Sequence, residues 1–373
     1  MERWIKNQII KDLDKKMVFI VGPRQVGKTW LAQDIAKTFK NTVYLNYDSI
    51  SDREIIKNEM WLDNTELLIF DEIHKMPEWK NYLKGVYDTK SENQKILVTG
   101  SARLDTFRHT GDSLAGRFYA HRLLPFSLKE LRHYQEDVNI HKLISRSGFP
   151  EPYLSENDID ASRWRSHYID GLIRIDILDF ERIHNLRAIM LILELLRERV
   201  GSPISYQSIS EDIGVSPNTV RKYIQIFEAL YIIFRITPYS KNIARSLKKE
   251  PKIYFFDNGM VKGGDGARFE NFIAVGLLKH VYGREDIYGI RSSLHYLRTK
   301  EKREVDFCIV EDGNAKKIIE TKLVDRNLSR ELLYFFSRYQ IPAIQVVLHL
   351  KQERKVNNIE IIKAEKFLSE LDF

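Results

Sequence analysis

Short apolar runs alternate with longer amphipathic stretches along the first third of the chain. The runs lie at residues 17–22, 42–48, 66–71, 95–100 and 118–124, and the stretches between them have helical spacing. This alternation is typical of a parallel sheet that helices cover on both faces. We therefore predict an α/β domain with a parallel sheet core over residues 1–135.

The pattern changes twice in the rest of the chain. Residues 136–184 have mainly helical spacing and are predicted to be a helical lid or connector. Residues 266–373 return to a mixture of strands and helices, an α/β pattern, with apolar runs at 305–310 and 317–322 joined by a polar turn. The glycine-rich stretch from Gly259 to Gly266 is predicted to be a flexible joint.

Residues 185–258 have the pattern of a winged helix. Apolar stripes predict helices over 186–198, 206–213 and 218–230, and two strands are predicted over 232–236 and 252–256. Ser216 is a suitable N-cap for the third helix, and Pro217 suits its first position. The basic turn from Arg245 to Lys249 would join the two strands of the wing.

In winged helices that bind DNA, the third helix enters the major groove by its N-terminal end. That placement would bring four polar side chains to base edges and phosphates: Asn218, Thr219, Arg221 and Lys222. Winged helices also serve as protein-interaction modules, and a solvated helix face has the same composition. The sequence leaves both alternatives open.

The first apolar run continues into a glycine-rich loop with the spacing G-x-x-x-x-G-K-T, and a helical segment follows. In this context the glycines let consecutive backbone N–H groups face an anion at the positive end of a helix dipole. Lys28 is predicted to reach the β- and γ-phosphates of ATP, and the Thr29 hydroxyl is predicted to bind Mg²⁺. The predicted nucleotide-binding residues are Gly22, Pro23, Arg24, Gln25, Val26, Gly27, Lys28, Thr29 and Trp30.

Two further runs end in polar side chains. Residues 66–72 end in Asp71, which can hold the Mg²⁺ shell, and Glu72, which can orient a water for attack on the γ-phosphate. The run at 95–100 would place Thr99 or Ser101 near the γ-phosphate if its strand lies between the other two, although helix capping is an alternative. An Asp-Glu pair with a polar third strand favours a hydrolytic ATPase over a small-molecule kinase.

Charged residues also interrupt the apolar runs of the last block. Alternation along a strand puts Glu320 and Lys322 on one sheet face, and Asp306 on the neighbouring strand can face the same point. Glu270 lies near the start of an amphipathic helix. Burying a charged side chain costs free energy unless the charge is paired or binds a metal ion.

This order of residues resembles the restriction-endonuclease-like PD-(D/E)xK pattern, with a helical Glu, a strand Asp and then E-x-K. The resemblance implies that Asp306 and Glu320 hold Mg²⁺ against a scissile phosphate, that Glu270 completes the metal shell, and that Lys322 stabilises or helps to generate the attacking hydroxide. The alternative is a retained fold with idle acids.

Composition narrows the class of protein. A length of 373 residues suggests two or three domains, and 59 Lys and Arg against 52 Asp and Glu give a net charge of +7, which permits contact with DNA. Cys308 is the only cysteine, which excludes an intrachain disulfide and a thiolate zinc cluster. The first residues lack the apolar core of a signal peptide, and no run approaches the ~18 apolar residues of a membrane span. We expect a cytoplasmic protein without membrane contact.

Taken together, these motifs resemble a widespread prokaryotic family of AAA+-superfamily ATPases with a winged helix and a C-terminal nuclease-like domain. The resemblance extends over nearly the whole chain. It rests on residues 22–29, 67–72, 98–101, 114–117, 124–130 and 148–152, on Trp164, Tyr168, Arg174 and Asp176, and on Glu270, Asp306, Glu320 and Lys322. It implies ATP binding and an AAA-like core. Arg117 and Arg103 are candidate γ-phosphate arginines, in their own site or in that of a neighbouring subunit, and structural ion pairs are the alternative.

The sequence thus predicts a Mg²⁺-dependent ATPase that acts on DNA or is regulated through it. The competing hypothesis is a nucleotide-gated switch that binds a protein partner and whose nuclease-like domain is idle.

Overall fold

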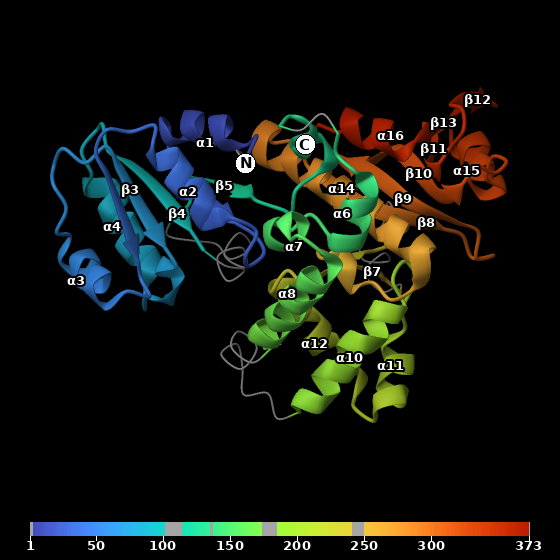
Figure 1. Ribbon diagram of the computed structural model, residues 1–373, viewed down its shortest axis with the longest axis horizontal. Coiled ribbons are helices and arrows are strands. Elements are labelled where there is room, and N and C mark those ends of the chain that lie inside the picture. Colours follow the sequence, from blue (N-terminus) through green and yellow to red (C-terminus); the bar gives the residue numbers. More distant parts are fainter. Residues whose placement is uncertain (1–2, 101–113, 135–136, 174–184, 241–249, 373) are drawn as a thin grey trace. The chain divides into compact units, whose positions relative to one another are not determined.

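The computed structural model describes residues 3–100, 114–134, 137–173, 185–240 and 250–372 (Figure 1). The chain divides into two compact units, one of residues 1–124 with 229–231 and the other of residues 125–228 with 232–373. We expected the first domain to extend to residue 135, but α5 (Leu128–Arg132) belongs to the second unit. There Arg132 forms an ion pair with Glu365 at 2.7 Å. Ser101, Arg103, Arg174, Asp176 and the basic turn at 245–249 lie outside the described residues.

The first unit is built on a five-stranded parallel sheet in the order β2-β3-β4-β1-β5. Its strands are β1 (Met17–Val21), β2 (Thr42–Asn46), β3 (Leu67–Asp71), β4 (Lys95–Thr99) and β5 (Phe118–Arg122). Each predicted strand is confirmed to within two residues. All residues of β1 and β3 are buried, which explains why both are continuous apolar runs rather than alternating ones.

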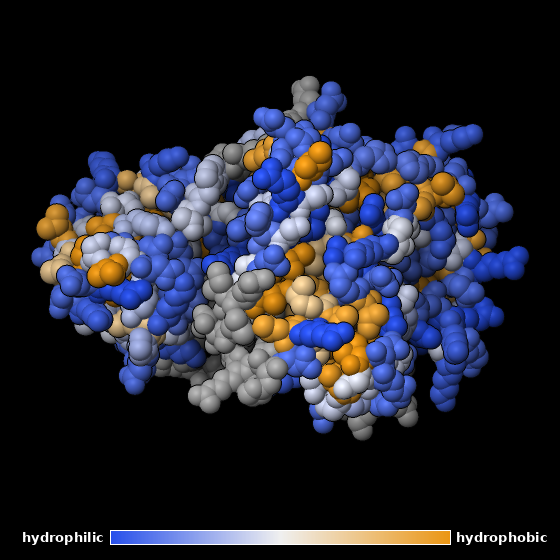
Figure 2. All heavy atoms as spheres, turned by 60° about the horizontal axis from the view of Figure 1, so that its bottom comes forward, coloured by the Kyte–Doolittle hydropathy of each residue, from blue (hydrophilic) through white to orange (hydrophobic). Residues whose placement is uncertain are grey.

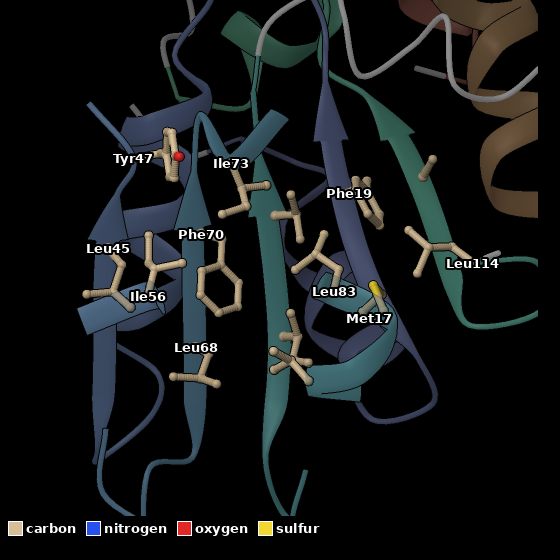
Figure 3. Packing of buried hydrophobic residues seen from close by; sticks show 14 of the residues in the cluster. Met17, Phe19, Leu45, Tyr47, Ile56, Leu68, Phe70, Ile73, Leu83 and Leu114 are labelled. Carbon is tan, nitrogen blue, oxygen red and sulfur yellow. The ribbon is translucent and has the colours of Figure 1, made fainter. Parts of the chain in front are cut away.

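Helices cover both faces of this sheet, as predicted. They are α1 (Lys6–Leu13), α2 (Lys28–Ala36), α3 (Ile50–Asn58) and α4 (Trp79–Thr89), with a 3-10 turn η1 (Ile73–Lys75) after β3. Figure 3 shows Met17 and Phe19 of β1 in one cluster with Leu68 and Phe70 of β3 and Leu83 of α4. This packing holds the parallel strands in register, so that their carboxyl ends lie at one edge of the sheet.

The second unit begins with short helices and continues with a three-helix element. Its first helices after α5 are α6 (Ile140–Arg146), α7 (Pro150–Leu154) and α8 (Asp158–Gly171). They are followed by α10 (Leu186–Glu198), α11 (Tyr206–Ile213) and α12 (Pro217–Ala229), and by an antiparallel pair of strands, β6 (Ile233–Ile236) and β7 (Lys252–Phe255). All five elements lie within one residue of their predicted bounds. Ser216 caps α12 as predicted, since its Oγ accepts the backbone N–H of Thr219 at 3.1 Å.

A six-stranded mixed sheet forms the rest of the second unit, in the order β12-β13-β11-β10-β9-β8. The strands are β8 (Ser292–Arg298), β9 (Glu304–Glu311), β10 (Asn314–Val324), β11 (Ala343–His349), β12 (Arg354–Val356) and β13 (Ile359–Lys363). Strands β8, β9 and β10 are antiparallel neighbours, whereas β11 runs parallel to β10 and to β13. The helices of this part are α14 (Gly264–Tyr288), α15 (Arg330–Tyr339) and α16 (Ala364–Glu370).

The expected flexible joint at 259–266 is instead part of regular structure. A 3-10 turn η5 (Asn258–Met260) includes its first residues, residues 261–263 form a short connection, and α14 begins at Gly264. Met260 and Val261 are buried, and the backbone N–H of Lys262 donates to the carbonyl of Arg197 at 2.9 Å. The glycines here serve the start of a long helix rather than a linker.

On the face that Figure 2 shows, the surface is mainly hydrophilic, with separate apolar patches. On α10, three large apolar side chains are well exposed: Leu186, Met190 and Leu191. Among the residues that the structure describes, no helix is both long enough and apolar enough to cross a bilayer.

Candidate nucleotide site and a second acidic centre

The glycine-rich loop lies at the carboxyl end of β1 and leads directly into α2. Gly22 has φ +148° and Gly27 has φ +98°, backbone conformations that favour glycine. A Cβ on Gly22 would lie 2.2 Å from the carbonyl oxygen of Leu123, so no larger residue fits there without a backbone shift. The loop has the geometry expected of a phosphate cradle at a helix N-terminus. Arg24, Gln25, Thr29 and Trp30 are exposed, whereas Pro23, Val26 and Lys28 are buried.

Lys28 folds back over this loop. Its Nζ donates to the carbonyl oxygens of Gly22, at 3.0 Å, and Pro23, at 2.6 Å. These contacts keep the ammonium beside the cradle, where it can be exchanged from backbone carbonyls to phosphate oxygens.

Asp71, the last residue of β3, accepts hydrogen bonds from three hydroxyl groups. Thr29 Oγ1 and Tyr44 Oη donate to its Oδ2 at 2.9 and 2.6 Å, and Thr99 Oγ1 donates to its Oδ1 at 2.6 Å. Strand β4 lies between β1 and β3, as predicted, and the register pairs Thr99 with Asp71. These hydrogen bonds bring together Thr29, Asp71 and Thr99, which the sequence singled out. That Thr99 lies near the γ-phosphate of a bound nucleotide stays a prediction.

The sequence analysis did not identify Tyr44 as a residue of this site. It lies on β2, one strand beyond β3, and burial together with the Asp71 carboxylate raises the pKa of its phenol. Only the strand order, which periodicity does not give, could have placed β2 beside β3.

Glu72 follows Asp71 in a left-handed conformation, with φ 56°, and its backbone N–H donates to the carbonyl of Thr99 at 3.0 Å. Its Oε2 lies 3.5 Å from Nε2 of His74 and 3.7 Å from Nζ of Lys75. Burial raises the pKa of Glu72, and Asp71 adds to this effect, whereas Lys75 and Lys28 oppose it. A carboxylate with a raised pKa is a stronger proton acceptor for a general-base step.

Arg117 does not belong to this edge of the sheet. The register pairs Met17 with Phe118, so Arg117 lies beside the start of β1, whereas the loop follows the end of β1. Five residues of strand separate the two places, roughly 16 Å at about 3.3 Å per residue. Arg117 instead forms a bidentate ion pair with Asp88 of α4, at 2.8 and 3.0 Å. The prediction that it serves its own nucleotide site is therefore wrong, and the structural ion pair is what the molecule has.

The second unit contains a separate acidic centre on β9 and β10. The register pairs Ile319 with Phe307, so the next pair along the ladder is Glu320 and Asp306, which share one sheet face. Asp306 Oδ2 accepts both the backbone N–H and the hydroxyl of Thr321 at 2.8 Å. Lys322 Nζ donates to Glu320 Oε1 at 2.6 Å.

Glu270 of α14 completes this group of acids. The hydroxyl of Tyr254 donates to Glu270 Oε1 at 2.7 Å. Burial, with Asp306 nearby, raises the pKa of Glu270 to about 8, although Lys252 opposes the shift. Burial and Asp306 likewise raise the pKa of Glu320 to about 7. The four residues singled out in the sequence are thus electrostatically coupled at one place.

The sequence did not indicate the centre's other cation, Lys252 of β7. Its side chain is 1% exposed, and its Nζ lies 2.8 Å from Glu304 Oε1, 3.5 Å from Glu270 Oε1 and 3.9 Å from Asp306 Oδ1. Among the described residues, no group of three or more acidic, histidine or cysteine side chains is arranged to hold a metal ion. Two of the acids predicted to bind Mg²⁺, Glu270 and Asp306, thus lie within 4 Å of the Lys252 ammonium.

The predicted DNA-facing residues of α12 lie on its outer surface. Asn218, Arg221 and Lys222 are exposed and Thr219 is half-buried, whereas the opposite face is buried, with Val220, Tyr223, Ile224 and Phe227. The Arg221 guanidinium lies 5.6 Å from the centre of the Tyr206 ring. The helix therefore has the amphipathic orientation that either of its proposed roles requires.

Comparison with known proteins finds family matches for three parts of the chain. Residues 14–132 match the family described as "AAA domain". Residues 137–263 match "Domain of unknown function (DUF8612)", and residues 265–367 match "Domain of unknown function (DUF4143)".

Similar proteins occur in bacteria and archaea. An uncharacterized protein of Methanocaldococcus jannaschii is 26% identical over 365 residues, which cover 87% of this chain and 78% of that protein. An uncharacterized protein of Mycobacterium tuberculosis is 21% identical over 352 residues, which cover 89% of this chain and 79% of that protein. Among solved structures, a Walker-type ATPase of Pyrococcus abyssi is similar with a TM-score of 0.45 and 14% identity, over 68% of this chain and 93% of that one. Residues 14–132 thus match the AAA domain family, and the loop after β1 within them has the glycine conformations expected of a phosphate-binding loop.

Proposed function

We propose that the protein binds ATP together with Mg²⁺ in its first unit and hydrolyses the γ-phosphate bond. The observation that supports this most strongly is the convergence at Asp71, where hydroxyls from the loop helix and from β4 meet the last residue of β3. A loop alone would fit any phosphate ligand. A carboxylate pair beside it provides both a metal site and a base.

The residues present fit a bound Mg²⁺. Thr29 Oγ1 and Asp71 Oδ2 lie 2.9 Å apart, so the two groups expected to hold the ion, directly or through water, are already adjacent. Bound there, Mg²⁺ would neutralise charge on the phosphates. Lys28 would leave its backbone carbonyls to bind phosphate oxygens, and Glu72 would orient a water and accept its proton.

We further propose that ATP binding is linked to duplex DNA through the three helices and two strands of residues 186–255, as a winged helix. The support is the exposed N-terminal half of α12, which presents Asn218, Arg221 and Lys222, on a chain with a net charge of +7. Cations on such a helix can contact phosphates as its first turn approaches base edges.

A second candidate function is a nucleotide-gated protein-interaction switch. Two observations favour it: the exposed apolar side chains Leu186, Met190 and Leu191 on α10, and the lysine within the acids of the nuclease-like centre. Exposed apolar patches commonly mark protein interfaces. In this case the last sheet would be a retained fold without cleavage.

Binding of a fluorescent ATP analogue tests the first proposal. The wild-type protein is expected to bind it more tightly with Mg²⁺ than without, and Lys28→Ala is expected to lose most of the affinity because the phosphate charge is left uncompensated. Lys57→Ala on the outer face of α3 is the matched control and should bind as the wild type does. Equal affinity in Lys28→Ala and Lys57→Ala would remove the nucleotide site from this loop.

Duplex binding separates the two functions. Each phosphate contact contributes about −0.9 to the slope of log affinity against log salt, so Arg221→Ala with Lys222→Ala is expected to reduce that slope by up to about 1.8. A control pair on the first unit, Lys37→Ala with Lys57→Ala, removes the same charge and should leave the slope nearly unchanged. If both pairs behave alike, non-specific charge is responsible and the interaction-switch function gains support.

A further inference from the structure

The acidic centre of the second unit contains more charge than its sequence pattern requires. Four carboxylates gather there, from Glu270, Glu304, Asp306 and Glu320, and two lysines, Lys252 and Lys322, lie among them. Lys322 belongs to the E-x-K pattern, and its ammonium lies 2.6 Å from Glu320 Oε1. Lys252 comes from β7, outside the six-stranded sheet, and requires a separate explanation.

Lys252 lies at the middle of the acids rather than at their rim. Its ammonium is within 4 Å of oxygens from three of the four carboxylates and 5.3 Å from the centre of the Tyr296 ring. A buried ammonium costs several kcal/mol unless opposite charges surround it, so this arrangement is stable only because the acids are present. Burial alone would lower the pKa of Lys252, but Glu270, Asp306 and Glu304 raise it above its ordinary value.

Several of the carboxylate oxygens that a divalent metal would need already accept hydrogen bonds. Asp306 Oδ2 takes two hydrogen bonds from Thr321, Glu270 Oε1 takes the Tyr254 hydroxyl, and Glu320 Oε1 takes Lys322. Glu304 is shared between Lys252 and Arg298, whose Nη1 lies 3.2 Å from Oε2. Glu320 Oε2 is a buried oxygen without a hydrogen-bond partner in the described part of the chain. The roughly six ligands of Mg²⁺ would therefore have to compete with these donors for the same carboxylates.

We propose that Lys252 is the resident cation of this centre: its ammonium takes the place of a divalent metal, and the centre binds no divalent metal while β7 is docked. This inference is independent of the ATP site in the first unit. It explains why the acids have the order of a metal-dependent nuclease and yet form no metal group among the described residues.

The same strand supplies a second contact to the centre, from Tyr254. Lys252 and Tyr254 are two positions apart and therefore point to one side of β7, toward Glu270. A Cβ on Gly201 would lie 2.7 Å from Glu270 Oε1, so the loop at Gly201 also packs tightly against this carboxylate. With β7 in place, Lys252 and Tyr254 therefore contact the carboxylates that a metal at this centre would need.

Titration with Mn²⁺ in the absence of nucleotide tests this proposal. Binding is measured as the loss of the paramagnetic resonance signal of the free ion. The wild-type chain and Asp306→Asn should bind Mn²⁺ equally, because Asp306 is not a ligand while Lys252 is in place. Lys252→Met, which retains the length of the side chain without its charge, should gain a site that binds at least about tenfold more tightly than the wild type does. Lys252→Arg should gain none, and Lys355→Met on the exposed edge strand β12 is the matched control.

Two results would overturn the proposal. One is saturable Mn²⁺ binding by the wild-type chain that Asp306→Asn abolishes, since this would make Asp306 a metal ligand with Lys252 present. The other is a Lys252→Met protein with unchanged circular dichroism and no gain of binding. Should Lys252→Met fail to fold, the comparison of the wild-type chain with Asp306→Asn still decides, because equal binding supports the proposal and unequal binding contradicts it.

Discussion

The phenol of Tyr44 is predicted to stabilise the first unit through Asp71, and Tyr44→Phe removes only that hydroxyl. The bond is 2.6 Å long and its acceptor is a buried carboxylate. Hydrogen bonds to charged groups contribute about 1.5–3 kcal/mol. In Tyr44→Phe, Asp71 would still accept hydrogen bonds from Thr29 and Thr99, so its charge is not left unpaired. The expected loss of stability therefore lies at the lower end of this range. We expect a loss of about 1.5 kcal/mol, or roughly tenfold in the unfolding equilibrium.

Urea unfolding followed by circular dichroism measures this loss, with Tyr119→Phe as the matched control. Tyr119 is a half-buried tyrosine of β5 whose ring lies 4.9 Å from the Lys16 ammonium, and no hydrogen bond joins its hydroxyl to any other described residue. The midpoint of the first unit's transition should fall in Tyr44→Phe and stay in place in Tyr119→Phe. Equal midpoints for the two variants would refute the claim that Tyr44 holds Asp71.

Three further outcomes follow from the geometry. Gly22→Ala should abolish binding of the ATP analogue, because its Cβ would press on the Leu123 carbonyl, and retained affinity would contradict the loop geometry. Arg117→Ala should leave that affinity unchanged, because its partner is Asp88, and weakened binding would return Arg117 to the site. The raised pKa of Glu270, about 8 against 4.5, means that the unfolded chain binds fewer protons between these values, so the unfolding free energy should fall as pH rises across that interval. Urea midpoints at several pH values should show a smaller fall in Glu270→Gln, and equal falls would contradict the burial of this acid.

Much of the fold could be predicted because its signals are local. The buried strands β1 and β3 are apolar throughout, and the cap at Ser216 with Pro217 sets the start of α12. The loop from Gly22 to Thr29 combines spacing with a preceding strand and a following helix, so its position at a strand end followed directly.

The remaining features depend on contacts between distant segments, which periodicity does not encode. Tyr44 reaches Asp71 only because β2 lies beside β3, and Arg117 lies far from the loop only because β5 runs parallel to β1. Lys252 is the clearest case. In the sequence it is the first residue of a wing strand, and nothing local indicates that it enters an acidic centre built from β9, β10 and α14.

Steady-state hydrolysis of ATP with Mg²⁺, by the wild-type chain and by Glu72→Gln, tests the central proposal most directly. The substitution retains size and hydrogen bonding but removes the charge that orients and deprotonates water. We predict that Glu72→Gln binds ATP as the wild type does and hydrolyses it at least about 100-fold more slowly. Hydrolysis by Glu72→Gln at the wild-type rate, or its absence in the wild-type chain, would contradict the account.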